Sequence, residues 1–184
     1  MPMHFEELDE TTRRFMLAEF ESEEASGKPY RARGLSPKGL SVFHDVMREA
    51  IQSGTEETLS AALANPAYWD RHEIYYRTGN PSTRRVNVHQ AAERLGLTEF
   101  NTWYVRGLAR RLLEDGEKEC QVYRAASPKG TPDTCPLQDG QIVPLQDVYR
   151  GHRASYWPEP GNPEALSVPS SPGCHHTIRR VRSS

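Results

Sequence analysis

Proline is spread unevenly along this chain, and its distribution limits what the C-terminal part can fold into. Nine of the 14 prolines in the 184 residues lie after residue 126. Because proline fixes one backbone angle and has no amide hydrogen to donate, no long helix or strand is expected there. The sequence therefore predicts two regions. Residues 1–126 are mostly helical, and 127–184 form a proline-rich, loop-dominated region that packs on the first because it cannot bury much alone.

The first region carries the start, spacing and stop signals of helices. Ser36-Pro37 is one such start, a capping hydroxyl followed by proline at the first helical position. Apolar residues then recur every three or four positions, and glycine follows where a C-terminal cap belongs. Helices are expected at 9–25, 36–54, 55–64, 87–96 and 98–116, and residues 66–86 fit either a short strand or an ordered loop ending in a turn.

Short strands are expected at 120–125, 141–145 and 177–182, where apolar residues lie between the prolines. Together with the helices they predict an α+β fold, in which a helical bundle of about five helices packs with a small sheet.

Charge and cysteine content exclude several classes of protein. The formal net charge of -2 excludes a globally basic binder, although it allows a local basic face. No window approaches the roughly 18–20 apolar residues of a membrane span. Acidic residues begin at Glu6, where a signal peptide would have its apolar core, so no signal peptide is expected. Three cysteines are too few, and odd in number, for a disulfide framework. We therefore expect a cytoplasmic protein without a membrane partner, or one resident in a particle assembled in the cytosol.

Cysteine and histidine gather in the C-terminal region. The candidate metal ligands are Cys135, His152, Cys174, His175 and His176. Zinc takes four thiolate or imidazole ligands in a tetrahedral array, and its binding can supply folding energy to a segment poor in apolar residues. The predicted set is Cys135, Cys174 and His176, with His152 or His175 as the fourth. The alternative is that the cysteines are small buried residues and the histidines lie on the surface.

Two segments of this region, Cys135-Pro136-Leu137-Gln138-Asp139-Gly140 and Ser171-Pro172-Gly173-Cys174-His175-His176, carry a family resemblance. They resemble the C-terminal signature of phage minor head (head morphogenesis) proteins, Cys-x-x-Cys-x-x-x-Asp-Gly followed later by His-Pro-x-Cys-Arg-Cys. Cys135 matches the second cysteine, and Cys174 matches the first cysteine of the closing block. The chain departs from the signature at Pro132, which replaces the first cysteine, at Ser171, which replaces the histidine, and at His175-His176, which replace Arg-Cys.

The resemblance implies a non-enzymatic structural or assembly protein of a phage or phage-like particle, close to the portal. Its partners would be other proteins of the assembly, including further copies of the same chain. The residues of 1–120 do not match the family's usual N-terminal half, so the resemblance is confined to the two C-terminal blocks.

A helix-turn-helix is the first alternative. Residues 88–98 resemble its first helix and glycine turn, and the following helix would present Arg106, Arg110 and Arg111 to DNA. That second helix also carries Phe100 and Trp103, which are typical of a core, so a plain helical hairpin is the favoured interpretation of this segment.

A zinc-dependent nuclease or other hydrolase is the second alternative. Such a site needs a metal, a base and a cation near the scissile bond. His175 and His176 lie close in sequence to Arg179 and Arg180, and Asp139 or Glu159 would be the base. No nuclease spacing links these residues, so the hypothesis requires the fold to bring them together.

Overall fold

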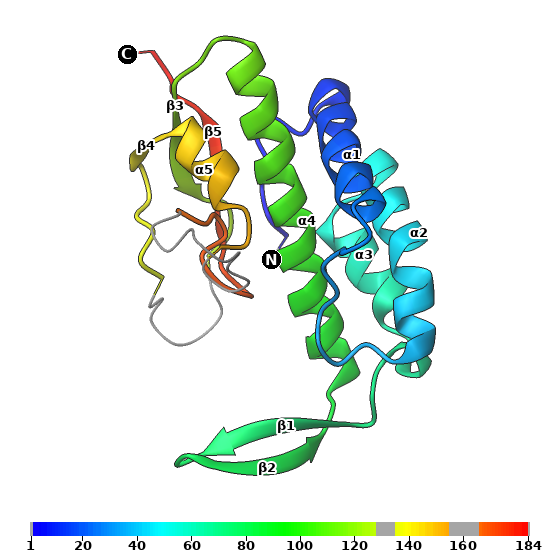
Figure 1. Ribbon diagram of the computed structural model, residues 1–184. Helices are drawn as coiled ribbons and strands as arrows, with labels where there is room; N and C mark the ends of the chain where they lie inside the picture. Colours follow the sequence, from blue (N-terminus) through cyan, green and yellow to red (C-terminus); the bar gives the residue numbers. More distant parts are fainter. Residues whose placement is uncertain (1, 128–134, 155–165, 184) are drawn as a thin grey trace.

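The structure, a computed structural model, describes residues 2–127, 135–154 and 166–183. It has the predicted α+β fold, in which one long helix separates a group of helices from a small sheet (Figure 1). The elements are α1 (Glu10–Ala25), α2 (Pro37–Ser53), α3 (Glu56–Leu63), the 3-10 turn η1 (Pro66–Tyr68), β1 (His72–Arg77), β2 (Asn80–Arg85), α4 (Val88–Glu114), β3 (Glu119–Arg124), β4 (Ile142–Pro144), α5 (Leu145–Gly151) and β5 (His176–Arg180).

The first three helices begin where the sequence places their caps. The carboxylate of Asp9 accepts a hydrogen bond from the Thr12 amide (2.8 Å), and the Ser36 hydroxyl accepts one from the Gly39 amide (3.2 Å). Thr55 opens α3 with a reciprocal capping box. Each cap supplies a partner for an amide that the first helical turn leaves without one, which explains why the predicted starts are confirmed.

Helix α4 corrects the predicted break at Gly96, because it runs without interruption through that residue. A Cβ atom at position 96 would overlap the Ser60 hydroxyl and approach the carbonyl of Glu56 on α3. Glycine is therefore needed here for close helix packing rather than for a turn. With no turn between two helices, the helix-turn-helix geometry is wrong for this segment. In the described part of the chain, no helix combines the length and the apolar character needed to cross a bilayer.

The core surrounds α4 and includes both regions of the chain. Trp103 and Tyr104 of α4 are fully buried, and the Trp103 ring packs edge-on against Phe20 of α1 (centroids 5.4 Å apart). Val148 of α5 and Ile178 of β5 belong to the same apolar cluster. Burial of this aromatic centre is worth several kcal/mol per ring, so the helices and the C-terminal region are stabilised by common contacts.

The predicted small sheet is present, with strand order β4-β3-β5 and antiparallel pairing throughout. In the register, Cys120 of β3 lies between Val143 of β4 and Arg180 of β5. The strand expected at 141–145 ends earlier than predicted, because Pro144 is the cap residue of α5. This short helix buries Leu145 and Val148 and contacts α4, so the C-terminal region is more regular than its prolines indicate.

Residues 72–85 form a hairpin, which settles the open assignment of 66–86. Strands β1 and β2 pair antiparallel around Thr78 and Gly79, whose φ angles of 49° and 81° are those of a tight hairpin turn. The ribbon projects from the end of the helical group at which α4 begins (Figure 1). It is the most exposed regular element, with Ile74 and Tyr76 at 68% and 73% exposure.

Candidate metal centre

Two segments far apart in the sequence bring three candidate ligands together. His176 begins β5 and Cys174 lies two positions before it, a spacing that directs side chains to the same face of an extended segment. Cys135 comes from the other block, 39 residues before Cys174. The ligand atoms of Cys135, Cys174 and His176 all lie within 4.8 Å of one another. The three residues form a group that can hold a metal ion.

The distances within the group are close to those of a tetrahedral zinc site. The two Sγ atoms are 3.4 Å apart, and Cys174 Sγ is 3.7 Å from Nδ1 of His176. With bonds of about 2.3 Å to sulfur and about 2.05 Å to nitrogen, a tetrahedron has edges of about 3.8 and about 3.6 Å. The two separations that involve Cys174 Sγ therefore differ from the tetrahedral edges by a few tenths of an ångström, and the ligand atoms of Cys135 and His176 lie within 4.8 Å of each other.

The surroundings hold the group against the core. His176 is fully buried and Cys174 is 5% exposed. The side-chain amide of Asn101, on α4, donates a hydrogen bond to the carbonyl of His176 (2.7 Å), and the Ser170 hydroxyl lies 2.9 Å from Cys135 Sγ. A metal bound here would join β5 to the segment around Cys135, and the Asn101 hydrogen bond holds the start of β5 against the central helix.

Burial also controls the protonation of the thiols. It raises the pKa of the Cys174 thiol, with the hydrogen bond to Cys135 acting in the same direction. Cys174 is therefore a thiol at neutral pH unless a cation stabilises the thiolate. Metal binding at this group would release protons and would weaken as the pH falls.

The structure places His152 and His175 apart from the three-residue group, which corrects both as predicted ligands. His152 Nε2 lies 3.3 Å from a carboxylate oxygen of Glu23, and its ring packs beside Trp103 (5.1 Å between centroids). Burial lowers the pKa of His152 to about 4, so the ring is a neutral core group. His175 lies between Cys174 and His176 in the sequence but does not belong to the group of three.

The three arginines predicted for DNA contact are engaged within the chain. Arg106 and Arg110 bind the two carboxylate oxygens of the buried Glu19 at 2.9 and 3.0 Å, and Arg111 binds Asp9 at 2.7 Å. Arg106 also lies over the Tyr149 ring, 4.1 Å from its centroid. These charges fasten α1 and α5 to α4, which the sequence could not show because Glu19 is 87 residues from Arg106.

The residues of the hydrolase hypothesis do not converge in the described part of the chain. Asp139 accepts a hydrogen bond from the amide of Arg124, and Arg179 and Arg180 pair with acidic residues at other positions. Glu159 lies outside the described residues. Among the described residues, no carboxylate joins the Cys/His group.

The third cysteine, Cys120, is a buried residue of β3, as predicted. Burial raises the pKa of its thiol to about 12, and it lies outside the three-residue group. Sequence reasoning missed Asn101, whose amide supports His176. Its signal is a polar residue between Phe100 and Trp103, on a helix face that otherwise reads as core.

Comparison of the chain with protein-family models, with curated proteins and with solved structures finds no match.

Proposed function

We propose that this chain is a non-enzymatic assembly protein of a phage or phage-like particle, resembling minor head proteins, with a structural zinc ion in its C-terminal region. One observation carries the proposal. Cys135 belongs to the first block of the resemblance and Cys174 and His176 to the second, and their ligand atoms lie within 4.8 Å of one another.

The substitutions relative to the family signature support the same proposal. His176 occupies the position of the last cysteine in that signature, and imidazole can replace thiolate as a zinc ligand. The position of the first cysteine, Pro132, lies outside the described residues. The signature thus retains ligand chemistry at the positions that meet in space.

A structural role fits the surroundings better than catalysis. Catalytic zinc sites keep an accessible position for water and a neighbouring general base. Here His176 is fully buried, and no carboxylate belongs to the group within the described residues. The ion would instead join the two segments of the proline-rich region that carry Cys135 and Cys174–His176, as metals do in segments with little apolar surface.

The test is whether the protein sediments with particles. Cells that carry the gene would be induced to release particles, and gradient fractions would be probed for this chain and for nuclease-protected DNA. We expect both in the same fractions, with Cys174→Ser lost from them and the matched Cys120→Ser retained. Particles that contain protected DNA but lack this chain would contradict the proposal.

A further inference from the structure

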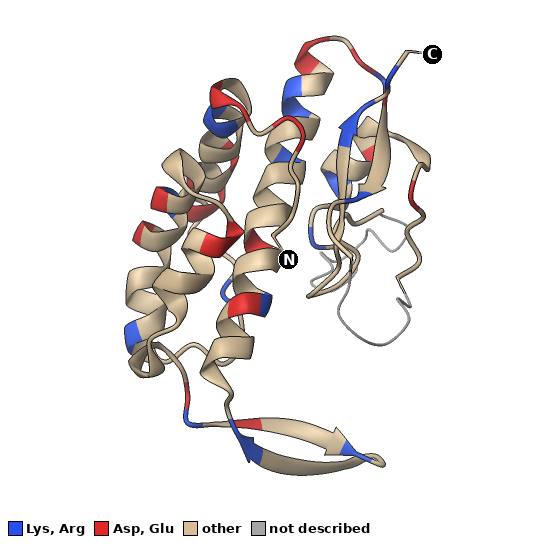
Figure 2. Ribbon diagram, turned by 180° about the vertical axis from the view of Figure 1, so that it is seen from behind, with Lys and Arg blue, Asp and Glu red and all other residues tan. Residues whose placement is uncertain are grey.

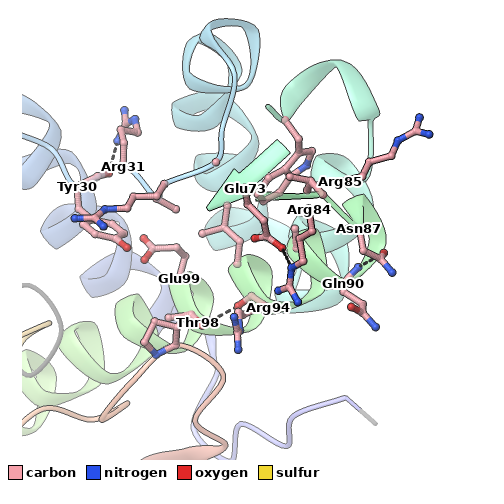
Figure 3. Close-up of a pocket in the computed structure, with 18 residues that line it drawn as sticks. Tyr30, Arg31, Glu73, Arg84, Arg85, Asn87, Gln90, Arg94, Thr98 and Glu99 are labelled. Atoms are coloured by element: carbon pink, nitrogen blue, oxygen red, sulfur yellow. Dashed lines mark hydrogen bonds and ion pairs between the residues drawn. The ribbon is translucent and has the colours of Figure 1, made fainter. Parts of the chain in front are cut away.

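A second feature of the molecule lies at the base of the hairpin, where a cavity of about 1050 Å³ opens between three parts of the chain. Its walls come from residues 30–34, from the hairpin base, and from the first turns of α4 (Figure 3). Pro172 adds a small part of the wall. The cavity is separate from the Cys/His group, none of whose members lines it.

The charge of this cavity differs from that of the whole chain. Its lining contains five arginines and two glutamates, whereas the whole chain has a net charge of -2. Glu99 is 1% exposed and one of its oxygens accepts a hydrogen bond from Arg153 (2.7 Å), so this carboxyl group is engaged inside the protein. Figure 2 shows the blue segments of the hairpin beside few red ones. Positive charge is therefore concentrated at this place.

Two of the five arginines are paired. Arg31 binds both oxygens of Glu24 at 2.7 and 2.8 Å, and Arg84 binds Glu73 at 2.6 Å. The other three behave differently. Arg33, Arg85 and Arg94 are exposed and form no ion pair or side-chain hydrogen bond with any residue that the structure describes. They are available to an anion from outside.

The neighbouring groups favour the same kind of ligand. Asn87 caps α4 and lines the cavity, so the positive end of a 27-residue helix faces this region. From the same rim the β1–β2 ribbon extends outward (Figure 1). Ile74 and Tyr76 point to one face of the ribbon, together with their cross-strand partners Thr83 and Pro81. The exposed arginines of the cavity therefore lie beside a β1–β2 ribbon that carries the exposed apolar side chains Ile74 and Tyr76.

We infer that the cavity rim and the β1–β2 ribbon form a binding surface for double-stranded DNA, in which Arg33, Arg85 and Arg94 contact backbone phosphates. A two-stranded ribbon fits the major groove of a duplex, and phosphate contacts fix its position there. The spread of cations over the cavity rim and the hairpin base suits an extended chain of phosphates better than one small anion. The surface requires neither the metal nor membership of a particle.

The test is a fluorescence anisotropy titration of the full chain with a labelled duplex over a range of salt concentrations. Three phosphate contacts predict a log–log salt slope of about -2.7, which weakens binding about 40-fold from about 50 to about 200 mM salt. Arg33→Gln, Arg85→Gln and Arg94→Gln should each reduce the slope by about 0.9. An unchanged slope in the triple variant would overturn the inference.

Matched variants separate local contacts from overall charge. Arg14→Gln removes the same charge from an exposed position on α1 that does not line the cavity, and it should leave the slope unchanged. Tyr76→Ser should weaken binding severalfold without changing the slope, because the ribbon contacts the groove and not phosphates. A fall in slope with Arg14→Gln as large as with Arg94→Gln would reject a localised site.

Two further binding measurements identify the ligand. Inorganic phosphate, exchanged for chloride at constant ionic strength, should not release the duplex, because a single phosphate engages only part of the surface. A single strand of the same length should bind more weakly than the duplex. Release by millimolar phosphate, or tighter binding of the single strand, would contradict the inference, while circular dichroism verifies that each variant is folded.

Discussion

The Cys/His group and the arginine cavity are neighbours, yet they differ in almost every physical respect. Pro172 lines the cavity, and Cys174, two residues later, belongs to the candidate metal centre. Cys174 and His176 of the candidate metal centre are buried and His176 is held by Asn101, whereas Arg33 and Arg94 are exposed and carry charges that the described chain does not balance. The first arrangement suits holding a fold together, and the second suits contact with a separate molecule.

The largest expected effect concerns the metal centre. Cys174→Ser should lower the free energy of unfolding by about 4 kcal/mol relative to protein with zinc at about a thousand times its dissociation constant. Guanidinium unfolding measures this change. A chelator should destabilise the unsubstituted protein to a similar extent and leave Cys174→Ser unaffected. A chelator effect that persists in Cys174→Ser would place the metal elsewhere.

The next effect tests whether His152 lies outside the metal centre. Burial lowers its pKa to about 4, whereas an unfolded histidine titrates near about 6.5. Between these values the unfolded chain binds the additional proton, so stability falls as the pH falls from about 6.5 to about 4. The loss amounts to at most about 3 kcal/mol.

His152→Gln should remove that part of the pH dependence and leave the zinc content unchanged. Denaturant unfolding of both proteins across this pH range gives the difference in their free energies of unfolding. Glu23, Arg106 and Arg153 face the ring in the unsubstituted protein and remain in the variant, so their own contributions largely cancel in this difference. Parallel curves for the two proteins, or loss of zinc from the variant, would show that His152 has another role.

A third prediction compares two kinds of arginine. Arg106→Gln should cost about 2 kcal/mol, because it removes an ion pair to Glu19, a hydrogen bond to the carbonyl of Tyr149 and the contact with the Tyr149 ring. Arg94→Gln should change stability by less than about 0.5 kcal/mol. Thermal or denaturant unfolding separates the two, and equal losses would refute the assignment of Arg94 to external contact.

The smallest expected effect links the two sites. Removing zinc should change the affinity for duplex DNA by less than about threefold, or about 0.65 kcal/mol. The reason is that Arg33, Arg85 and Arg94 come from elements other than the segment that carries Cys174. Anisotropy titrations with and without chelator measure this coupling. A tenfold loss would mean that the Pro172 wall determines the cavity's shape.

Local signals explain which parts of the fold could be predicted. Ser36-Pro37 and Thr55 place helix starts because capping acts within three residues. The helix end predicted at Gly96 is wrong, because a glycine that lets two helices approach cannot be told in the sequence from one that ends a helix. Helix α5 was missed because seven residues after a proline carry little periodicity.

The kind of chemistry at the candidate site could be predicted from the sequence, but which side chains meet there could not. Cysteine and histidine in an apolar-poor segment predict a metal site, but only the fold shows that His152, predicted as a possible fourth ligand, lies beside Glu23 and not at the group. The same holds for the arginines. The charge of each arginine is evident from the sequence, but its ion-pair partner is not. Arg106 pairs with Glu19, 87 residues away, and Arg85 pairs with no carboxylate in the described chain.

Metal analysis of the purified chain tests the central claim most directly. We predict about one equivalent of zinc in the unsubstituted protein, in Cys120→Ser and in His152→Gln, and loss of the zinc in Cys135→Ser and Cys174→Ser. Less than about a tenth of an equivalent in the unsubstituted protein, or zinc that survives both of the last two substitutions, would contradict the account.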